Sequence, residues 1–389
     1  MRALSEHSKA VLPVTSVVTF LGFLDTHLLI PVIALYASGL EASAALVGLI
    51  VGLYSIVNTP ANIFFGRLID RVGYKAPLVG GLAGSVVSMV LYAFTRNPFH
   101  LALVRALHGA TGALVAPSSM SIMAYHSTAR NRARAMSFYG IALASAALIG
   151  YPISGLIASR IGFNALFFFG ASMVGIGMLL GLMLPRESGH PRRTQAGGAG
   201  LAEVRNLLAR KGLLVSYAAI FTQYFTFGSV VTLLPMHVAQ LGMGALEIGM
   251  LLGAFSAVFV VTQFLGGAIS DRAGRLPTVV GGLLCVILGL TVLPWLSGLV
   301  PLAAAMALYG VGYGLMFPSI SALITDNTII EERGLATGLF HALLTAGVAI
   351  GAPLMGWVGG LVGTGTGLLI TPVPMVFALV IALMFLRHR

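Results

Sequence analysis

The sequence predicts an all-α integral membrane protein whose twelve transmembrane helices form two six-helix bundles. Hydrophobic residues make up 58% of the chain and charged residues only 8%, whereas a soluble domain is roughly 25% charged. Apolar runs recur at the length that a bilayer requires, and many residues of the first half return in the second half at one offset. A soluble core could not bury so much apolar surface, so we expect lipid to be the solvent.

The apolar runs define the predicted spans. A helix needs about 20 apolar residues to cross the hydrocarbon core. Connections as short as Arg96-Asn97-Pro98 force neighbouring helices to run antiparallel. The predicted spans cover residues 12–37, 45–69, 77–95, 99–124, 135–159, 163–184, 212–238, 245–270, 277–297, 300–325, 334–361 and 366–386.

One long connection divides the chain. It predicts a bundle over residues 1–185, a cytoplasmic linker over 186–211 and a second bundle over 212–389. The run Gly197-Gly198-Ala199-Gly200 favours a flexible linker. Residues 201–208 place their leucines and Val204 on one helical face, so this part is either a short surface helix or a disordered basic segment.

The two halves repeat each other at an offset of 201 residues, the separation of Asp70 and Asp271. The same offset relates Gly73 to Gly274, Gly109 to Gly310, Pro117 to Pro318, Ser118 to Ser319, Arg132 to Arg333, Pro152 to Pro353 and Gly155 to Gly356. So many matches predict an internal duplication. We therefore expect two bundles of one topology, related by a pseudo-twofold axis along the membrane normal.

The basic residues follow the predicted topology. The formal net charge is +11, and of the 22 Lys and Arg only Arg96, Arg105 and Arg160 lie away from the termini and the even-numbered loops. This is the positive-inside distribution, and it places both termini and the linker in the cytoplasm. The basic loops would then lie against anionic lipid. We therefore expect no nucleic-acid partner.

Other compositional features exclude several kinds of site. The single cysteine, Cys285, cannot form an intramolecular disulfide, and no Cys/His spacing suggests a metal or cofactor. The first apolar run is too long for a cleaved signal and contains Asp25. Glycine-rich runs lie inside spans and precede no Gly-Lys-Ser/Thr motif, so we interpret them as helix-packing surfaces and not as phosphate loops.

A short charged turn in each half carries a family resemblance. Gly66-x-Leu68-x-Asp70-Arg71-x-Gly73-x-Lys75 resembles the signature of the major facilitator superfamily between its second and third helices, although Tyr74 stands where the family usually has a basic residue. The resemblance implies transport by rocking of one bundle against the other. It also implies a conformational latch at the turns, formed by Gly66, Asp70, Arg71, Gly73, Asp271 and Arg272. The alternative is a solvated turn that only sets topology.

Asp25 is the most informative acid, because it lies near the middle of the first predicted span. A charge there costs on the order of 2.5–3.5 kcal/mol, and burial favours the protonated acid. The sequence around Leu24-Asp25-Thr26-His27 resembles the first-helix motif of the drug:proton antiporters of this superfamily. The resemblance implies a proton site, whereas the alternative is an aspartate paired only for structure.

Arg105 is the one basic residue well inside a predicted span. With His108, Gly109 and Gly112 it resembles the fourth-helix motif of the family, whose arginine is implicated in proton coupling. We therefore expect Asp25 and Arg105 to form a switchable pair. His341 is a third proton-coupling candidate because histidine titrates near neutrality, although a neutral, hydrogen-bonded role is the simpler interpretation for His341 and for His108.

Polar side chains inside the spans are the candidates for a substrate cavity. In lipid such groups face the bundle interior, where they either line a cavity or join helices through hydrogen bonds. The candidates are Asn58, Tyr54, Tyr139, Gln223, Gln263 and Tyr309. In the fifth span, Gly150-Tyr151-Pro152 resembles the antiporter motif of the family imperfectly, because Tyr151 separates the glycine from the proline.

Together these features predict a secondary active transporter of the cell membrane. The single buried acid and the aromatic spans favour proton-coupled efflux of hydrophobic or cationic small molecules. A proton-coupled transporter of sugars or another polar metabolite remains an alternative, and so does a lipid translocase. We expect no enzyme, since no nucleophile–base pair or metal cluster lies at one depth. The expected partners are a small-molecule substrate, protons and membrane lipid, and we expect a monomer.

Overall fold

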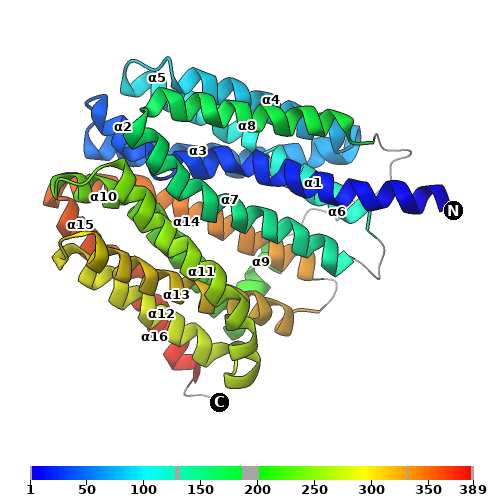
Figure 1. The fold of residues 1–389 in the computed structure, drawn as a ribbon. Coiled ribbons are helices and arrows are strands. Elements are labelled where there is room, and N and C mark those ends of the chain that lie inside the picture. The colour runs from blue at the N-terminus through cyan, green and yellow to red at the C-terminus, as the bar shows by residue number, and fades with distance from the viewer. Residues whose placement is uncertain (1, 128–131, 186–200, 330–331, 387–389) are drawn as a thin grey trace. The chain divides into compact units, whose positions relative to one another are not determined.

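The computed structural model describes residues 2–127, 132–185, 201–329 and 332–386 (Figure 1). Every regular element within these ranges is a helix. Twelve helical segments are long and apolar enough to cross a membrane, which confirms the predicted number of spans. Residues 186–200 of the predicted linker lie outside the described ranges.

The first half of the chain contributes eight helices. They are α1 (Arg2–Leu29), α2 (Ile33–Gly39), α3 (Ala44–Val72), α4 (Lys75–Tyr92), α5 (Pro98–Gly112), α6 (Val115–Tyr125), α7 (Arg132–Arg160) and α8 (Phe163–Met183). The second half contributes α9 (Leu201–Leu208), α10 (Lys211–Gln240), α11 (Ala245–Ala273), α12 (Arg275–Val292), the 3-10 helix η1 (Leu293–Trp295), α13 (Leu299–Asp326), α14 (Arg333–Val362), α15 (Thr364–Ile370) and α16 (Val373–Leu386).

Three spans that the sequence predicted as continuous are interrupted. The first breaks between α1 and α2 at Pro31, and the last breaks between α15 and α16 at Pro372. The fourth breaks between α5 and α6 at residues 113–114. Pro117 lies four residues after Ala113, and its missing N–H and its ring oppose a helical hydrogen bond to that carbonyl. The apolar runs were located correctly, but their backbone breaks were not.

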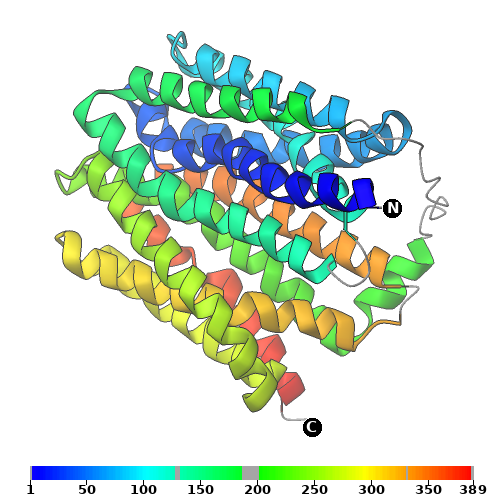
Figure 2. The same ribbon diagram turned by 45° about the vertical axis from the view of Figure 1, so that its right-hand side comes forward.

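The contacts between residues group the chain into two compact units. The first unit comprises residues 1–41 and 53–194, and the second comprises 42–52 and 195–389. In the first unit α1 packs on α7 and α4 packs on α5, while in the second α10 packs on α14 and α12 on α13. These helices can be followed in Figures 1 and 2. Helices that correspond in the repeat therefore make corresponding pairs.

The duplication extends to individual contacts. A Cβ atom at Gly109 would lie 2.6 Å from the carbonyl oxygen of Tyr54, so α5 lies directly on the backbone of α3. A Cβ atom at Gly310 would lie 2.5 Å from the carbonyl oxygen of Phe255 on α11. Tyr54 and Phe255 are separated by the same offset as the two glycines. Close approach of small residues is the usual means of joining helices in lipid.

Residues 201–208 form the short helix α9. This is one of the two alternatives that the sequence left open for them, the other being a disordered segment. The chain that follows it is held by Arg210, whose guanidinium donates to both carboxylate oxygens of Glu332, at 2.6 and 2.7 Å. The same guanidinium donates to the carbonyl of Asn327 at 3.0 Å. This bidentate pair ties the start of α10 to the connection between α13 and α14.

The Arg210–Glu332 pair predicts a pH-dependent stability. The hydrogen bond from Arg210 lowers the pKa of Glu332 below its ordinary value of 4.5. A carboxyl group with a lowered pKa stabilises the fold above its ordinary pKa, and this contribution is lost as the pH falls through the lowered value. We expect Glu332→Gln to lower the apparent Tm in detergent at pH 7, and the difference from the wild type to vanish on acidification. Glu41→Gln, at an exposed position, serves as the control. A difference in apparent Tm between Glu332→Gln and the wild type that stays constant down to pH ~3.5 would contradict a stabilising role of the ionised Glu332.

Candidate functional site

Asp25 lies on α1 and is only 1% exposed. Its Oδ1 accepts hydrogen bonds from the backbone N–H and the hydroxyl of Thr26. Its Oδ2 lies 3.0 Å from Nε2 of His108 on α5, and His108 is fully buried. A carboxyl group and an imidazole therefore share a site inside the first unit.

The second ring nitrogen of His108 also has a partner. Its Nδ1 lies 3.3 Å from the hydroxyl of Tyr92 on α4, so Asp25, His108 and Tyr92 form one chain across α1, α5 and α4. A doubly protonated imidazole donates from both nitrogens, whereas the neutral ring has one donor and one acceptor.

Arg105 lies one helical turn before His108 and is 3% exposed. Its guanidinium carbon lies 5.0 Å from the centre of the Tyr54 ring, as a cation–π contact. Its Nε and Nη1 atoms are buried without a hydrogen-bond partner among the described residues. The expected ion pair with Asp25 is not formed between these two described side chains, because His108 occupies the carboxylate. The exchange of partners that the sequence suggested therefore stays a prediction.

The polar groups of α3 hold α5 in place. Asn58 Nδ2 donates to the carbonyl of Gly109 at 3.0 Å, and its Oδ1 accepts from Asn62. The Tyr54 ring meets the His108 ring edge-on at 5.3 Å. Asn58 therefore joins helices in this structure, whereas Tyr139, on α7, contacts the ring of Phe23 at 6.4 Å.

In the second unit, Gln223 and Tyr309 belong to one aromatic cluster. Tyr309 stacks on Phe255 at 5.0 Å and donates its hydroxyl to Tyr313 at 3.0 Å. Tyr313 in turn donates to the backbone carbonyl of Gln223. The Gln223 side chain is fully buried, and neither atom of its amide has a partner among the described residues. Gln263 is half-buried on α11.

The repeat relates the two buried clusters chemically. The offset takes Asp25 to Thr226 and His108 to Tyr309, and these two side chains also meet, with hydroxyl oxygens 3.1 Å apart. It takes Arg105 to Met306. The same contact is therefore made twice, once with titratable groups and once with neutral hydroxyls. The 201-residue offset could have drawn attention to His108 from the sequence alone, because it pairs His108 with Tyr309, which was already a candidate for the substrate cavity.

The remaining candidates lie on other helices and turns. His341 is on α14 in the second unit, with an exposed side chain. Gly73 ends α3 at φ 87° and Gly274 ends α11 at φ 95°, a left-handed conformation that favours glycine. Arg71 lies in the last turn of α3, and Gly66 on the same helix has open space beside it.

Of the predicted latch residues, the side chain of Asp70 lies outside the described side chains. Asp271 accepts a hydrogen bond from Arg275, which also reaches Asp326 at 3.3 Å, while Arg272 is exposed. In the first turn, Lys75 instead donates to the carbonyls of Leu182, at 2.7 Å, and Leu184 at the end of α8. Tyr74 is buried beside His126, 2.9 Å from its Nε2.

Comparison with known proteins identifies the family. The family model described as Major Facilitator Superfamily matches residues 15–328 and 216–389. The chain therefore belongs to this superfamily. It is a multi-pass membrane transporter and not an enzyme.

Two curated proteins are similar to this chain over most of its length. The inner membrane transport protein YajR of Escherichia coli is 27% identical over 350 residues, which cover 88% of this chain and 75% of YajR. The multidrug resistance protein MdtG of Proteus mirabilis is 26% identical over 310 residues, which cover 78% of this chain and 75% of MdtG.

Solved structures share the fold across the whole chain. A bacterial homologue of the human lysosomal transporter Spinster, inward-facing and unoccupied, superposes with a TM-score of 0.82 at 15% identity and covers 98% of both chains. A mutant of the nucleoside transporter NupG gives a TM-score of 0.78 at 15% identity and covers 97% of this chain and 99% of NupG. The predicted fold class is thereby confirmed.

The glycine contact at the site gives a prediction about α5. Gly109→Ala would place a methyl group 2.6 Å from the Tyr54 carbonyl oxygen and 3.0 Å from its Cα, so α5 must move from α3 and take His108 with it. We expect a destabilisation of about 1–3 kcal/mol, measured as a lower apparent Tm. The matched control is Gly140→Ala on α7, where no described atom outside the backbone of its own helix and its chain neighbours lies within 4 Å of the added Cβ. Equal Tm values for the two variants would refute this packing argument.

Proposed function

We propose that this transporter exports hydrophobic or cationic small molecules in exchange for protons, by alternating access. The observation that carries the proposal is the buried Asp25–His108 pair, with Oδ2 and Nε2 3.0 Å apart. Ionisable side chains buried inside transmembrane segments are typical of the proton pathways of pumps and transporters.

Coupling requires that the proton affinity of the site differ between two conformations. Arg105 provides a physical means for this difference. In this structure its guanidinium lies on Tyr54, with two nitrogens buried and unpaired, which is an unfavourable state for a cation. A second conformation that brings Arg105 to Asp25 would satisfy both charges and expel the proton. His108 would hold the carboxyl group in the conformation seen here.

The proposed substrate class follows from the second unit. Tyr224 and Phe227 are half-buried beside Tyr313, with ring centres 6.2 and 6.4 Å from it. Aromatic faces bind apolar groups and attract cations. The MdtG relatives are multidrug resistance proteins by name, which supports the proposed efflux.

A second candidate is transport of a polar metabolite, and Gln223 favours it. Neither atom of its buried amide has a partner among the described residues, and a buried amide without hydrogen bonds calls for an explanation. A solute that accepts and donates hydrogen bonds would provide one. The structural neighbour NupG is a nucleoside transporter by name. Lipid translocation is a third candidate function, and the fluorescent phospholipid in the proteoliposome experiment described below tests it.

The topology and the latch are part of the same proposal. The basic loops favour cytoplasmic termini in an inner or plasma membrane, with the domain boundaries at residues 185 and 212 and a monomeric transporter. Asp70, Arg71 and Gly73, with Gly66 and the equivalent Asp271 and Arg272, would stabilise one access state from the membrane surface. His341 would be an accessory proton site.

Asp25→Asn tests the proton coupling. In proteoliposomes with an imposed pH gradient, we expect the wild type to accumulate a lipophilic cation, and we expect the asparagine variant to lose this accumulation while it retains downhill exchange of the same compound. A nucleoside and a fluorescent phospholipid complete the substrate panel. Glu41→Gln is the control. Gradient-driven accumulation by Asp25→Asn would refute the coupling role, and accumulation of the nucleoside or the phospholipid alone would replace the proposed substrate class.

Asp70→Asn tests the latch. After replacement of Cys285 by serine, single cysteines at the two ends of the spans report which side is open to a membrane-impermeant thiol reagent. We expect the variant to shift labelling several-fold between the two sides, because it removes a charge that stabilises one state. Unchanged labelling on both sides would show that the turn only sets topology.

A further inference from the structure

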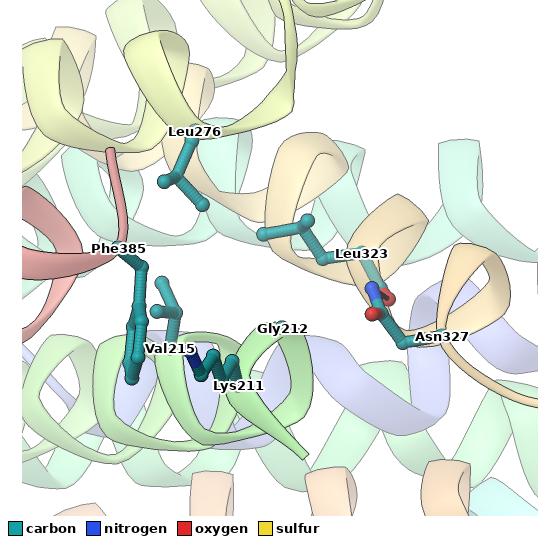
Figure 3. A pocket seen from close by; sticks show the side chains of 7 residues that line it. All are labelled: Lys211, Gly212, Val215, Leu276, Leu323, Asn327 and Phe385. Atoms are coloured by element: carbon teal, nitrogen blue, oxygen red, sulfur yellow. Dashed lines mark hydrogen bonds between the residues drawn. The ribbon is translucent and has the colours of Figure 1, made fainter. Parts of the chain in front are cut away.

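A cavity lies among the helix ends of the second unit, beside the Arg210–Glu332 pair (Figure 3). Its volume is about 170 Å³, and it is lined by Lys211, Gly212, Val215, Leu276, Leu323, Asn327 and Phe385. These residues come from the start of α10, the start of α12, the end of α13 and its connection, and the end of α16. Four spans therefore contribute to the cavity at the ends where their apolar segments stop.

The lining combines an apolar wall with a polar edge. Val215, Leu276, Leu323 and Phe385 form the wall, and Figure 3 shows Phe385 across the cavity from Asn327. Gly212 makes room for the Asn327 side chain, because a Cβ there would lie 2.4–2.5 Å from the atoms of its amide. Asn327 Nδ2 donates to the carbonyl of Leu323 at 2.8 Å, which orients the amide at the cavity edge.

Among the described residues, Lys211 is the basic side chain at this edge that no acid pairs, while the two neighbouring arginines are balanced by three carboxylates. Arg210 is paired with Glu332, and Arg275 with Asp271 and Asp326. Lys211 has no ion pair among the described residues, and its ammonium lies 5.6 Å from the centre of the Phe385 ring. The first turn of α10 also has no side-chain cap, so its N–H groups remain available to an anion.

We propose that this cavity binds the head group of an anionic phospholipid. The phosphodiester lies against Lys211 and the first N–H groups of α10, and an acyl chain continues along the half-buried Phe385 into the bilayer. The cavity is smaller than the ~300–1,000 Å³ of pockets that enclose a drug-sized ligand, so it accommodates a head group and not a whole lipid. Basic pockets between the ends of transmembrane helices are typical lipid head-group sites. This site is independent of the proposed proton and substrate sites.

Native mass spectrometry of the full-length protein tests the proposal. Protein is exchanged into vesicles of phosphatidylglycerol or phosphatidylcholine and extracted in mild detergent, and the retained lipid is counted. We expect one phosphatidylglycerol to be retained by the wild type and by Lys211→Arg. We expect about fivefold weaker retention for Lys211→Gln, since one lysine contributes about 1 kcal/mol to anionic-lipid binding, and none for Lys211→Glu. Lys211 is exposed, so these variants should fold.

The controls separate this site from general attraction to basic surfaces. Arg205→Gln on α9 removes an exposed positive charge outside the cavity and should leave retention unchanged. Equal retention of the two lipids by the wild type, or equal loss in Arg205→Gln and Lys211→Gln, would overturn the proposal. Displacement of the lipid by millimolar inorganic phosphate alone would also overturn it, because the cavity would then be a site for free anions.

Discussion

The structure depends most on the burial of one carboxyl group in a membrane-spanning helix segment that contains no other acid. Asp25 is 1% exposed, and it is stabilised by Thr26 on its own helix and by His108 on α5. An unpaired acid at this position would be costly in lipid. The position of α5 is therefore constrained from two directions. The imidazole must reach α1, and Gly109 must allow α5 to lie directly on Tyr54 of α3. The same two contacts of α5 therefore determine both the packing of the first unit and the chemistry of its site.

The internal duplication shows which part of this arrangement is structural and which part is chemical. The second unit repeats the glycine contact with Gly310 and Phe255, and it repeats the side-chain contact with Thr226 and Tyr309. Hydroxyl groups satisfy each other without a charge, so the contact joins helices there at no electrostatic cost. In the first unit the same geometry carries Asp25, His108 and Arg105. A framework built twice from small residues can therefore support a titratable site in one copy and an aromatic cluster in the other.

Much of the fold was predictable because the membrane constrains it so strongly. Twelve spans and the repeated turns at Gly73 and Gly274 follow from hydropathy and glycine, whereas the sequence left residues 201–208 open between a helix and a disordered segment. The breaks at Pro31, at residues 113–114 and at Pro372 were missed because a hydropathy run counts apolar side chains and does not register a lost backbone hydrogen bond. The partner of Asp25 was also different from the expected one. Arg105 and His108 share a face of α5, and only the relative height of α1 and α5 decides between them.

By itself, the sequence determined that the chain spans a membrane, that it is a duplicated bundle of helices, and that Asp25 is an acid where acids are costly. Composition and spacing suffice for these conclusions, because each of them depends on residues close together in the chain or on a constant offset. Only the tertiary structure decided that His108 holds Asp25, that Arg105 lies on Tyr54 with unpaired nitrogens, and that four helix ends enclose a cavity beside Lys211. These facts depend on how far each helix is displaced along its neighbours. A displacement of a single turn, about 5.4 Å, changes which side chains meet and leaves the hydropathy pattern unaltered.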